Sequence, residues 1–286
     1  MKVLVFGESG QVARALARAG SARRIVVQTL SRAQADLSDP ETCAAAIAAT
    51  DADAVVNAAA WTAVDAAEDQ EQAAHVVNAE APGAMARACA ARGLPFVHLS
   101  TDYVFDGSGT RPRAPEDATA PLGAYGRTKL AGERAVLDSG AHAVILRTSW
   151  VFDGTGKNFV TTMLRLSETR DALSVVADQT GGPTPAAAIA EACLTIAQAL
   201  VEGRGQGGIH HISGAPDVSW AGFARAIFDI AGRRVTVTDI TTDQYPTPAH
   251  RPANSRLDCT SLKTAFGIDR PDWRSALHDI LKETTP

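Results

Sequence analysis

Short apolar runs alternate with longer Ala-rich segments through the first half of the chain. Each short run has the composition of a strand buried on both faces, and each Ala-rich segment has the spacing of a helix with one polar side. Glycines follow several of the helical segments, where a left-handed residue commonly ends a helix. The predicted strands are residues 2–6, 24–30, 54–57, 96–100 and 143–148, and the predicted helices are residues 10–20, 40–50, 66–92 and 125–139.

Alternation of strand and helix with short connections indicates parallel strands joined by crossover helices. We therefore expect an α/β fold, a Rossmann-type doubly wound parallel sheet, over residues 1–150. After this point the pattern changes to amphipathic helices, short strands and a proline-rich segment at 245–252 that cannot be helical. We expect residues 151–286 to form mainly a smaller C-terminal substrate-binding lobe, with residues 151–180 partly returning to the main sheet.

Amino-acid composition mainly excludes other classes of protein. The chain has 286 residues, of which 45% are hydrophobic and 21% charged, and its net charge is −5. Because it contains no basic block, nucleic acid is not an expected partner. No apolar run is long enough to span a membrane, and Met1-Lys2 leads directly into a strand, which leaves no room for a signal peptide. A cytoplasmic protein is expected.

Cysteine and histidine spacing gives no sign of a metal site. The cysteines form no C-x-x-C pair, and the histidines form no H-x-x-x-H or H-E-x-x-H arrangement. We therefore expect reduced, packed thiols and no metal ligands. The cysteines are Cys43, Cys89, Cys193 and Cys259.

Tyr125 and Lys129 carry the candidate chemistry. A phenol and an ammonium one helical turn apart lie on the same face of a helix. There the ammonium is expected to lower the pKa of the phenol and to hold a nucleotide ribose beside it. Such a phenol exchanges a proton with a carbinol oxygen while a nicotinamide exchanges hydride with the attached carbon. The pair indicates a short-chain-type dehydrogenase or reductase, and the long loop at 102–123 is expected to cover its site.

The turn after the first strand is the candidate site for a dinucleotide pyrophosphate. The pattern Gly7-x-x-Gly10-x-x-Ala13 puts a helix N-terminus at the end of that strand, where backbone N–H groups bind phosphate. The second predicted strand ends without the acid that binds a ribose 2′-hydroxyl, and Ser31 and Arg32 can instead accept a 2′-phosphate. NADPH is thus favoured, with NADH as the alternative. The predicted cofactor-binding residues are Gly7, Gly10, Gln11, Val12, Ser31, Arg32, Asp36, Leu37, Ala58, Ala59, Ala60, Tyr125 and Lys129.

Ordered motifs extend along almost the whole chain. They include Asn57-Ala58-Ala59-Ala60, Ser100-Thr101-Asp102-Tyr103-Val104-Phe105, Tyr125-Gly126-x-Thr128-Lys129, Arg147-Thr148-Ser149-Trp150, Asp178-Gln179-x-Gly181-x-Pro183-Thr184 and Tyr245-Pro246-Thr247-Pro248-Ala249-x-Arg251-Pro252. In this order they resemble the dTDP-4-dehydrorhamnose reductase family, which is a group of extended short-chain dehydrogenases.

The resemblance implies hydride transfer from NAD(P)H to C4 of dTDP-4-dehydro-6-deoxy-L-mannose, which gives dTDP-L-rhamnose for cell-surface polysaccharide. It implies Tyr125 as the proton donor, Lys129 as its electrostatic partner and ribose ligand, and Thr101 as the hydroxyl that fixes the substrate oxygen. The substrate-binding residues that it implies are Val64, Thr101, Asp102, Tyr103, Trp150, Asn158, Gln179, Arg251 and Asn254.

Neighbouring activities differ from this one at few positions. Related 4,6-dehydratases carry Thr-Asp-Glu where this chain has Thr101-Asp102-Tyr103, so elimination is not expected. A reductase forming the C4 epimer, dTDP-6-deoxy-L-talose, stays open. So does a non-catalytic NADP-binding protein similar to the regulatory subunit of methionine adenosyltransferase.

Oligomeric state and metal dependence rest on the resemblance alone, which implies a homodimer. Some family members bridge Mg²⁺ between subunits through glutamates, one of them near the C-terminus. Glu283 is the only nearby candidate here, in an altered tail, so the site is not carried over and a requirement for Mg²⁺ stays open.

Overall fold

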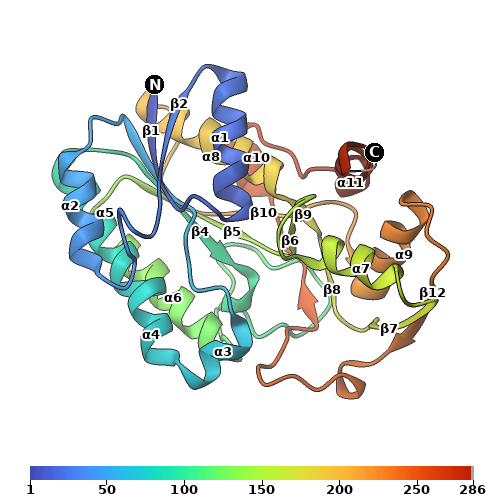
Figure 1. Ribbon diagram of the computed structural model, residues 1–286. Helices are drawn as coiled ribbons and strands as arrows, with labels where there is room; N and C mark the ends of the chain where they lie inside the picture. Colours follow the sequence, from blue (N-terminus) through green and yellow to red (C-terminus); the bar gives the residue numbers. More distant parts are fainter. Residues whose placement is uncertain (285–286) are drawn as a thin grey trace.

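A six-stranded parallel sheet forms the larger of two lobes in the computed structural model, which describes residues 1–284 (Figure 1). The strand order is β10-β5-β4-β3-β1-β2. The chain leaves β1 toward β2 on one side and toward β3, β4 and β5 on the other, so the topological switch point lies at β1, where such sheets bind ligands. The Rossmann-type fold predicted from the sequence is confirmed. The strands are β1 (Lys2–Phe6), β2 (Val26–Leu30), β3 (Ala54–Asn57), β4 (Phe96–Thr101), β5 (Ala143–Thr148) and β10 (Gly208–Ile212).

Alternate residues of the central strands pack on opposite faces of the sheet, as strand geometry requires. Val3 and Val5 join a core that includes residues of α1, α8 and α10, whereas Leu4 and Phe6 join a core that includes residues of α2 and α5. Because every central strand is covered on both sides, its sequence is continuously apolar. The helices are α1 (Gln11–Arg23), α8 (Ala186–Val201) and α10 (Thr260–Phe266) on one face, and α2 (Pro40–Ala49), α5 (Ala81–Arg92) and α6 (Ala124–Leu137) on the other.

The single helix predicted at 66–92 is wrong, because the segment is broken into four pieces. α3 (Val64–Asp69) and α4 (Glu71–His75) are followed by the π-helical turn η1 (Val76–Glu80), which leads into α5. In η1, the buried Asn78 amide donates to the Thr128 hydroxyl of α6 at 3.1 Å and to the Trp61 carbonyl at 3.2 Å. The π turn, with one extra residue, thus lets Asn78 bond to two neighbouring segments. The spacing of apolar residues along the sequence gives no sign of these contacts.

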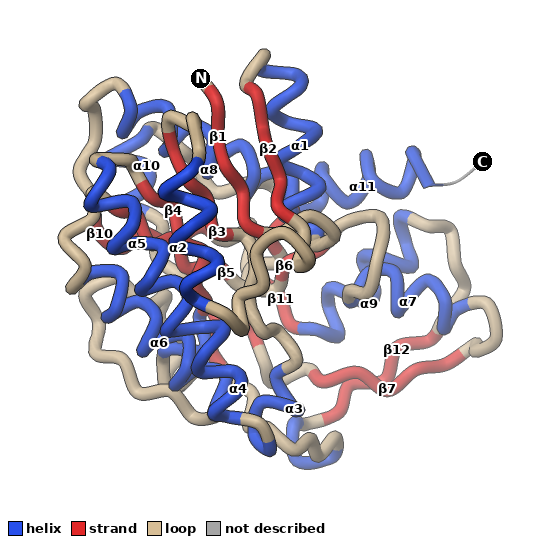
Figure 2. The backbone as a smooth tube through the Cα atoms, turned by 60° about the vertical axis from the view of Figure 1, so that its left-hand side comes forward, coloured by secondary structure: helices blue, strands red, loops and turns tan. Residues whose placement is uncertain are grey.

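The smaller lobe packs helices against a two-stranded parallel ribbon, which Figure 2 shows apart from the main sheet. Its core is aromatic: Phe223 contacts the rings of Phe152, Phe159 and Trp273. The elements are α7 (Phe159–Ser167), β7 (Ala172–Val176), α9 (Trp220–Ile230), β12 (Thr236–Ile240) and α11 (Trp273–Thr284). Two-residue strands pair in the region between the smaller lobe and the main sheet. They are β6 (Val151–Phe152), β8 (Thr180–Gly181), β9 (Thr184–Pro185), β11 (Val218–Ser219) and β13 (Asn254–Ser255). The two 3₁₀ turns are η2 (Asp102–Val104) and η3 (Thr242–Gln244).

The chain returns to the main sheet later than the sequence suggests. Residues 151–180 contribute no strand to the six-stranded sheet, which corrects the prediction that they partly return to it. The return is made by α8, which packs on α1, and by β10, whose Ile209 pairs with Ile145 at the sheet edge. α8 is long and apolar enough to cover the sheet, whereas β7 instead finds its partner in β12. The division of the chain at residue 150 stays a prediction.

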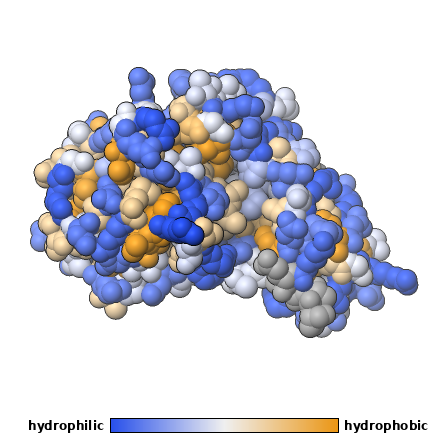
Figure 3. All heavy atoms as spheres, turned by 90° about the horizontal axis from the view of Figure 1, so that it is seen from above, coloured by the Kyte–Doolittle hydropathy of each residue, from blue (hydrophilic) through white to orange (hydrophobic). Residues whose placement is uncertain are grey.

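The face of the molecule seen in Figure 3 carries polar side chains interspersed with apolar ones. Among residues 1–284, no helix combines the length and the hydropathy needed to cross a bilayer. The four cysteines are free and buried, and burial raises the pKa of the Cys43, Cys89 and Cys193 thiols to about 12. These thiols are therefore protonated, packed side chains.

Candidate active site

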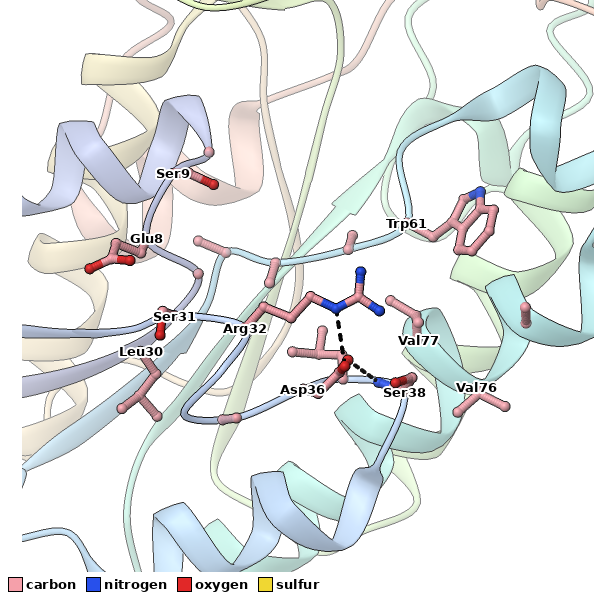
Figure 4. Close-up of a pocket in the computed structure, with 18 residues that line it drawn as sticks. Glu8, Ser9, Leu30, Ser31, Arg32, Asp36, Ser38, Trp61, Val76 and Val77 are labelled. Atoms are coloured by element: carbon pink, nitrogen blue, oxygen red, sulfur yellow. Dashed lines mark hydrogen bonds and ion pairs between the residues drawn. The ribbon is translucent and has the colours of Figure 1, made fainter.

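A cavity of about 650 Å³ opens at the carboxyl ends of β1, β2 and β3 (Figure 4). This is the switch point of the sheet, the expected place for a dinucleotide. One wall is the β1–α1 turn, a second is the loop after β2, and a third is the segment that follows β3. The sequence-predicted residues that line the cavity are Gly7, Gly10, Ser31, Arg32, Asp36, Leu37, Ala58, Ala59 and Ala60.

The β1–α1 turn presents backbone rather than side chains to this cavity. Gly7 has φ +107°, a conformation that side chains disfavour, and a Cβ there would meet Ala59 at 3.4 Å. Gly10 is the N-cap of α1, and no side chain caps that end of the helix. The first N–H groups of α1, which begins with Gln11 and Val12, are therefore available to an anion such as a pyrophosphate.

Arg32 reaches over the open side of the cavity, where Figure 4 shows its guanidinium above Asp36. Its Nε donates to Asp36 Oδ2 at 3.0 Å, and the Arg32 side chain is 83% exposed. Hydrogen bonds from Ser38 to Asp36, together with Arg32, hold the pKa of this carboxyl below its usual value. The ion pair between Arg32 and Asp36 at the edge of the cavity was not predicted from the sequence. Most of the Arg32 N–H groups still face solvent, where a phosphate can bind them.

Thr101, Tyr125 and Lys129 are brought together by β4 and α6. Thr101 ends β4, and the other two lie one turn apart on α6. The Thr101 hydroxyl is within hydrogen-bonding reach of the Tyr125 phenol. Burial lowers the pKa of Lys129 to about 8, and its Nζ donates to the Leu99 carbonyl at 2.7 Å. This is a hydroxyl, a phenol and an amine at the carboxyl edge of the sheet.

The pKa of the Tyr125 phenol moves in the opposite direction to the one expected. Burial raises it to about 12, a hydrogen bond from Thr101 only partly offsets this, and the charge of Asp102 raises it further. The predicted lowering by Lys129 is therefore wrong for this structure. Desolvation of the phenolate outweighs the other effects although Tyr125 is only half-buried, and Tyr103 lies in edge contact with its ring at 5.4 Å between centroids. Tyr125 holds its proton at neutral pH, as a proton donor must.

Asp102 is the least satisfied polar group in this region. It is 3% exposed, its Oδ1 accepts from the Thr101 hydroxyl at 3.1 Å, and its Oδ2 has no hydrogen-bond partner among the described residues. Burial raises its pKa to about 6, and the nearby Thr101 and Ser255 hydroxyls only partly oppose this shift. One carboxyl oxygen is thus left for a group that the polypeptide does not supply.

The residues expected to contact the nucleotide have protein partners in this structure. Arg251 donates from Nη2 to Asp65 at 2.8 Å, and Gln179 donates to the Thr242 hydroxyl at 3.1 Å. Asn158 caps α7, with its Oδ1 accepting from the Thr161 N–H at 3.1 Å. The buried Asn254 donates to the Arg111 carbonyl at 2.8 Å, which ties the loop at 106–113 to β13. Val64, which is expected to contact the sugar, is the first residue of α3.

Trp150 has a partner that sequence patterns did not reveal. Its φ is +51°, which is uncommon for a bulky residue, and its ring stacks on Trp220 with centroids 3.6 Å apart. Trp220 begins α9, so the stack ties the end of β5 to the smaller lobe. The only sign of this stack in the sequence was the aromatic residue Trp220 at the start of an amphipathic helix.

A buried ion pair lies one turn beyond Lys129. Arg147 donates to both carboxylate oxygens of Glu133, at 2.8 and 2.7 Å, and both side chains are almost fully buried. Ser100 also donates to Glu133, at 2.5 Å. This network fixes α6 against β4 and β5, and so fixes the positions of Tyr125 and Lys129.

The described residues contain no cluster of three or more His, Cys, Asp or Glu side chains placed to hold a metal ion. The side chain of Glu283, the candidate raised by the sequence, lies outside the described residues.

Fold and site together define a short-chain-type dehydrogenase or reductase that binds a nicotinamide dinucleotide. Residues 1–285 match the family model of the RmlD substrate binding domain, and the chain belongs to that family. The resemblance found in the sequence is thereby confirmed.

Relatives and solved structures agree with this assignment. A dTDP-4-dehydrorhamnose reductase of Sinorhizobium fredii is 45% identical, with 98% of this chain and 97% of the relative covered. The enzyme of that name from Escherichia coli is 38% identical, with 99% and 98% covered. A crystal structure of a dTDP-4-dehydrorhamnose reductase from Clostridium acetobutylicum superposes with a TM-score of 0.93 at 34% identity, covering 99% of both chains. The Bacillus anthracis enzyme, solved in complex with NADP, has a TM-score of 0.91 at 30% identity, also covering 99% of both.

Proposed function

We propose that this chain reduces the C4 keto group of dTDP-4-dehydro-6-deoxy-L-mannose with NADPH and forms dTDP-L-rhamnose. The observation that carries the proposal is the meeting of Thr101, Tyr125 and Lys129 at the carboxyl edge of the sheet, the edge at which the cavity opens, in a chain whose relatives bear the reductase name over nearly their whole length.

The cavity residues fit a nicotinamide dinucleotide. The uncapped N-terminus of α1 suits the pyrophosphate, and the small side chains of Ala58, Ala59 and Ala60 leave its path along the sheet open. Ser31 and Arg32 suit a 2′-phosphate, and Asp36 and Leu37 line the adenosine end. Lys129 would hold the ribose next to Tyr125. The cofactor supplies the hydride when it is bound.

The chain supplies the proton and the electrostatic stabilisation. Tyr125 keeps its proton because burial raises its pKa to about 12, so it can donate to the carbonyl oxygen. Negative charge develops on that oxygen as C4 is reduced. Hydrogen bonds from the Tyr125 and Thr101 hydroxyls to that oxygen would stabilise the transition state more than the ketone. Asp102, whose Oδ2 has no hydrogen-bond partner among the described residues, would accept from a sugar hydroxyl.

The substrate would lie between the lobes. Val64, Tyr103 and Trp150 would contact the sugar, and Asn158, Gln179, Arg251 and Asn254 the nucleotide and its diphosphate. Of the last group, Arg251 is the best suited, because its guanidinium keeps N–H donors beyond those that contact Asp65 and Ala249. The same proposal extends to a cytoplasmic location and to a homodimer, for which resemblance to the reductase family is the support.

The test is NADPH oxidation in the presence of the dTDP-4-keto sugar generated in situ, followed by NMR of the product, with and without a Mg²⁺ chelator. Oxidation with an equatorial C4 hydroxyl in the product is expected. An axial hydroxyl would identify the talose-forming reductase instead. Cofactor binding without any oxidation would overturn the proposal and favour a non-catalytic NADP-binding protein.

A further inference from the structure

His98 is a fully buried titratable side chain that the proposed reaction does not use. It lies on β4 and is 0% exposed, with Phe96 stacked nearby at 6.1 Å between ring centroids. Its two ring nitrogens face different polar groups. Nδ1 lies 3.2 Å from Asn57 Nδ2 on β3, and Nε2 lies 3.4 Å from Lys129 Nζ on α6.

The neighbour of Nδ1 fixes where the imidazole carries its proton. Asn57 Oδ1 accepts the backbone N–H of Ala59 at 3.1 Å, and a backbone N–H can only donate, so the orientation of the Asn57 amide is set. The NH₂ group of Asn57 is therefore the group that faces His98. Because an amide nitrogen has no acceptor capacity, Nδ1 must be the unprotonated nitrogen. The proton of the neutral ring is left on Nε2, which faces Lys129.

This arrangement distinguishes between the two forms of Lys129. An ammonium group would meet the Nε2–H of His98 donor to donor. An uncharged amine has a lone pair that can accept this hydrogen, while its own N–H donates to the Leu99 carbonyl at 2.7 Å. The amine is therefore satisfied by two partners, and the ammonium by only one.

We propose that His98 is a positioning residue for Lys129: its Nε2–H, directed by Asn57, stabilises the uncharged amine and lets this buried lysine exchange its proton near neutral pH. The inference rests on the proposed function only in taking Lys129 as part of the active site.

The surroundings of the pair agree with this role. Burial and the nearby charge of Lys129 hold the pKa of His98 well below its usual value, so the ring is neutral. Burial also lowers the pKa of Lys129, to about 8, and Glu133 on the same helix opposes this shift. Glu133 is itself paired with Arg147, which offsets its charge. Among the described residues, no other charged side chain acts on Lys129.

The first experiment measures the unsubstituted protein and uses a variant only for assignment. Long-range ¹H–¹⁵N NMR of the protein reports the tautomer of each histidine, and the His98 signals are those missing in His98→Phe. We expect His98 as the neutral Nε2–H tautomer, unchanged as the pH falls below the usual titration range of histidine. A neutral Nδ1–H tautomer, or a ring that protonates like a free histidine, would overturn the inference. If His98→Phe does not fold, the His98 signals are assigned by elimination from single substitutions of the other six histidines, and the readout itself is taken on the unsubstituted protein.

The second experiment measures the pKa of Lys129 by NMR of its side-chain carbons, with Lys129→Met for assignment. His98→Phe keeps a ring of similar size but removes the N–H donor, so we expect the pKa of Lys129 to rise by about one unit, a tenfold gain in proton affinity. If burial alone set this pKa, the apolar ring would leave it unchanged or lower it, and either result would refute the role of His98. His210→Phe on β10 is the matched control and should have no effect.

Neither readout depends on turnover. If NADPH oxidation fails while His98 and Lys129 behave as expected, the proposed function is wrong and the inference stands. If turnover is present but the pKa of Lys129 does not rise in His98→Phe, the inference is wrong and the proposed function stands.

Discussion

At the scale of single residues, the phenol of Tyr125 is decisive because it holds its proton at neutral pH. We expect Tyr125→Phe to lower turnover by about a hundredfold or more, since a positioned general acid contributes that much. NADPH binding, followed by fluorescence titration, should change little because the ring is kept. Near-normal turnover in this variant would remove Tyr125 as the proton donor.

Arg32 tests the preference for the 2′-phosphate. Its guanidinium is exposed over the cavity and held by Asp36. Arg32→Ala should weaken NADPH binding about tenfold, the loss typical of one exposed charge-assisted contact, and leave NADH binding nearly unchanged. Dissociation constants for both cofactors, measured by titration, check this. Equal losses for the two cofactors would end the argument for a 2′-phosphate site.

Asp102 should make stability depend on pH in a predictable direction. Its pKa is about 6 in the folded chain, against 3.8 for an unperturbed aspartate, so the folded state binds more protons than the unfolded state between these pH values. Stability contributed by this group therefore falls as the pH rises through that window, and the cost of the buried carboxylate is fully present above pH 6.

Asp102→Asn removes this titration. The free energy of unfolding of the variant relative to the parent should thus be higher at pH 7.5 than at pH 4.5, by about 2 kcal/mol. Urea unfolding at the two pH values measures the difference. A constant difference between variant and parent at both pH values would show that the Asp102 carboxyl is not perturbed.

At the scale of elements, the packing of α6 on η1 positions the active site. Gly132 of α6 has no room for a side chain, because a Cβ there would overlap the carbonyl oxygen of Asn78. This is a backbone atom of the π-helical turn, so it cannot move aside cheaply.

We expect Gly132→Ala to lower the free energy of unfolding by about 1–3 kcal/mol, as overpacking typically does, and to reduce turnover by shifting Tyr125 and Lys129. Gly10→Ala is the control for stability, since a Cβ there meets nothing within 4 Å. Urea unfolding of both variants gives the comparison. Equal stability of the two variants would mean that the helix contact is looser than the structure shows.

The prediction of helices and strands from the sequence was most successful for strands that are buried on both faces of the sheet. β1, β3 and β5 have the predicted bounds, because a strand covered on both faces is apolar along its whole length. The helix predicted at 66–92 was wrong because Asn78 makes its hydrogen bonds to α6 and Trp61, far apart in sequence. Apolar periodicity contains no information about such contacts.

At the scale of the whole molecule, the two halves of the chain are interleaved. The core on one face of the sheet combines Val3, Val5 and Val144 with Ile189 and Cys193 of α8. β10 completes the edge of the sheet beside β5. The first 150 residues alone would leave the part of that face under α8 uncovered and the edge beside β5 unpaired.

We therefore expect a fragment of residues 1–150 not to fold on its own, and the whole chain to unfold in one cooperative transition. Circular dichroism during urea titration of both proteins provides the check. A cooperative transition in the fragment would show that the predicted boundary separates an independent domain, against the packing of α8.

The sequence by itself determined the class of fold, the dinucleotide turn and the family. These follow from local features: apolar runs, glycines that allow close backbone approach, and a phenol and an amine one helical turn apart. Only the tertiary structure decided the protonation states and the partners. Tyr125 keeps its proton because surrounding residues desolvate it, Lys129 meets His98 because β4 lies under α6, and Arg251 meets Asp65 from a distant part of the chain. Burial and contacts between distant segments set these properties, and neither is encoded in local spacing.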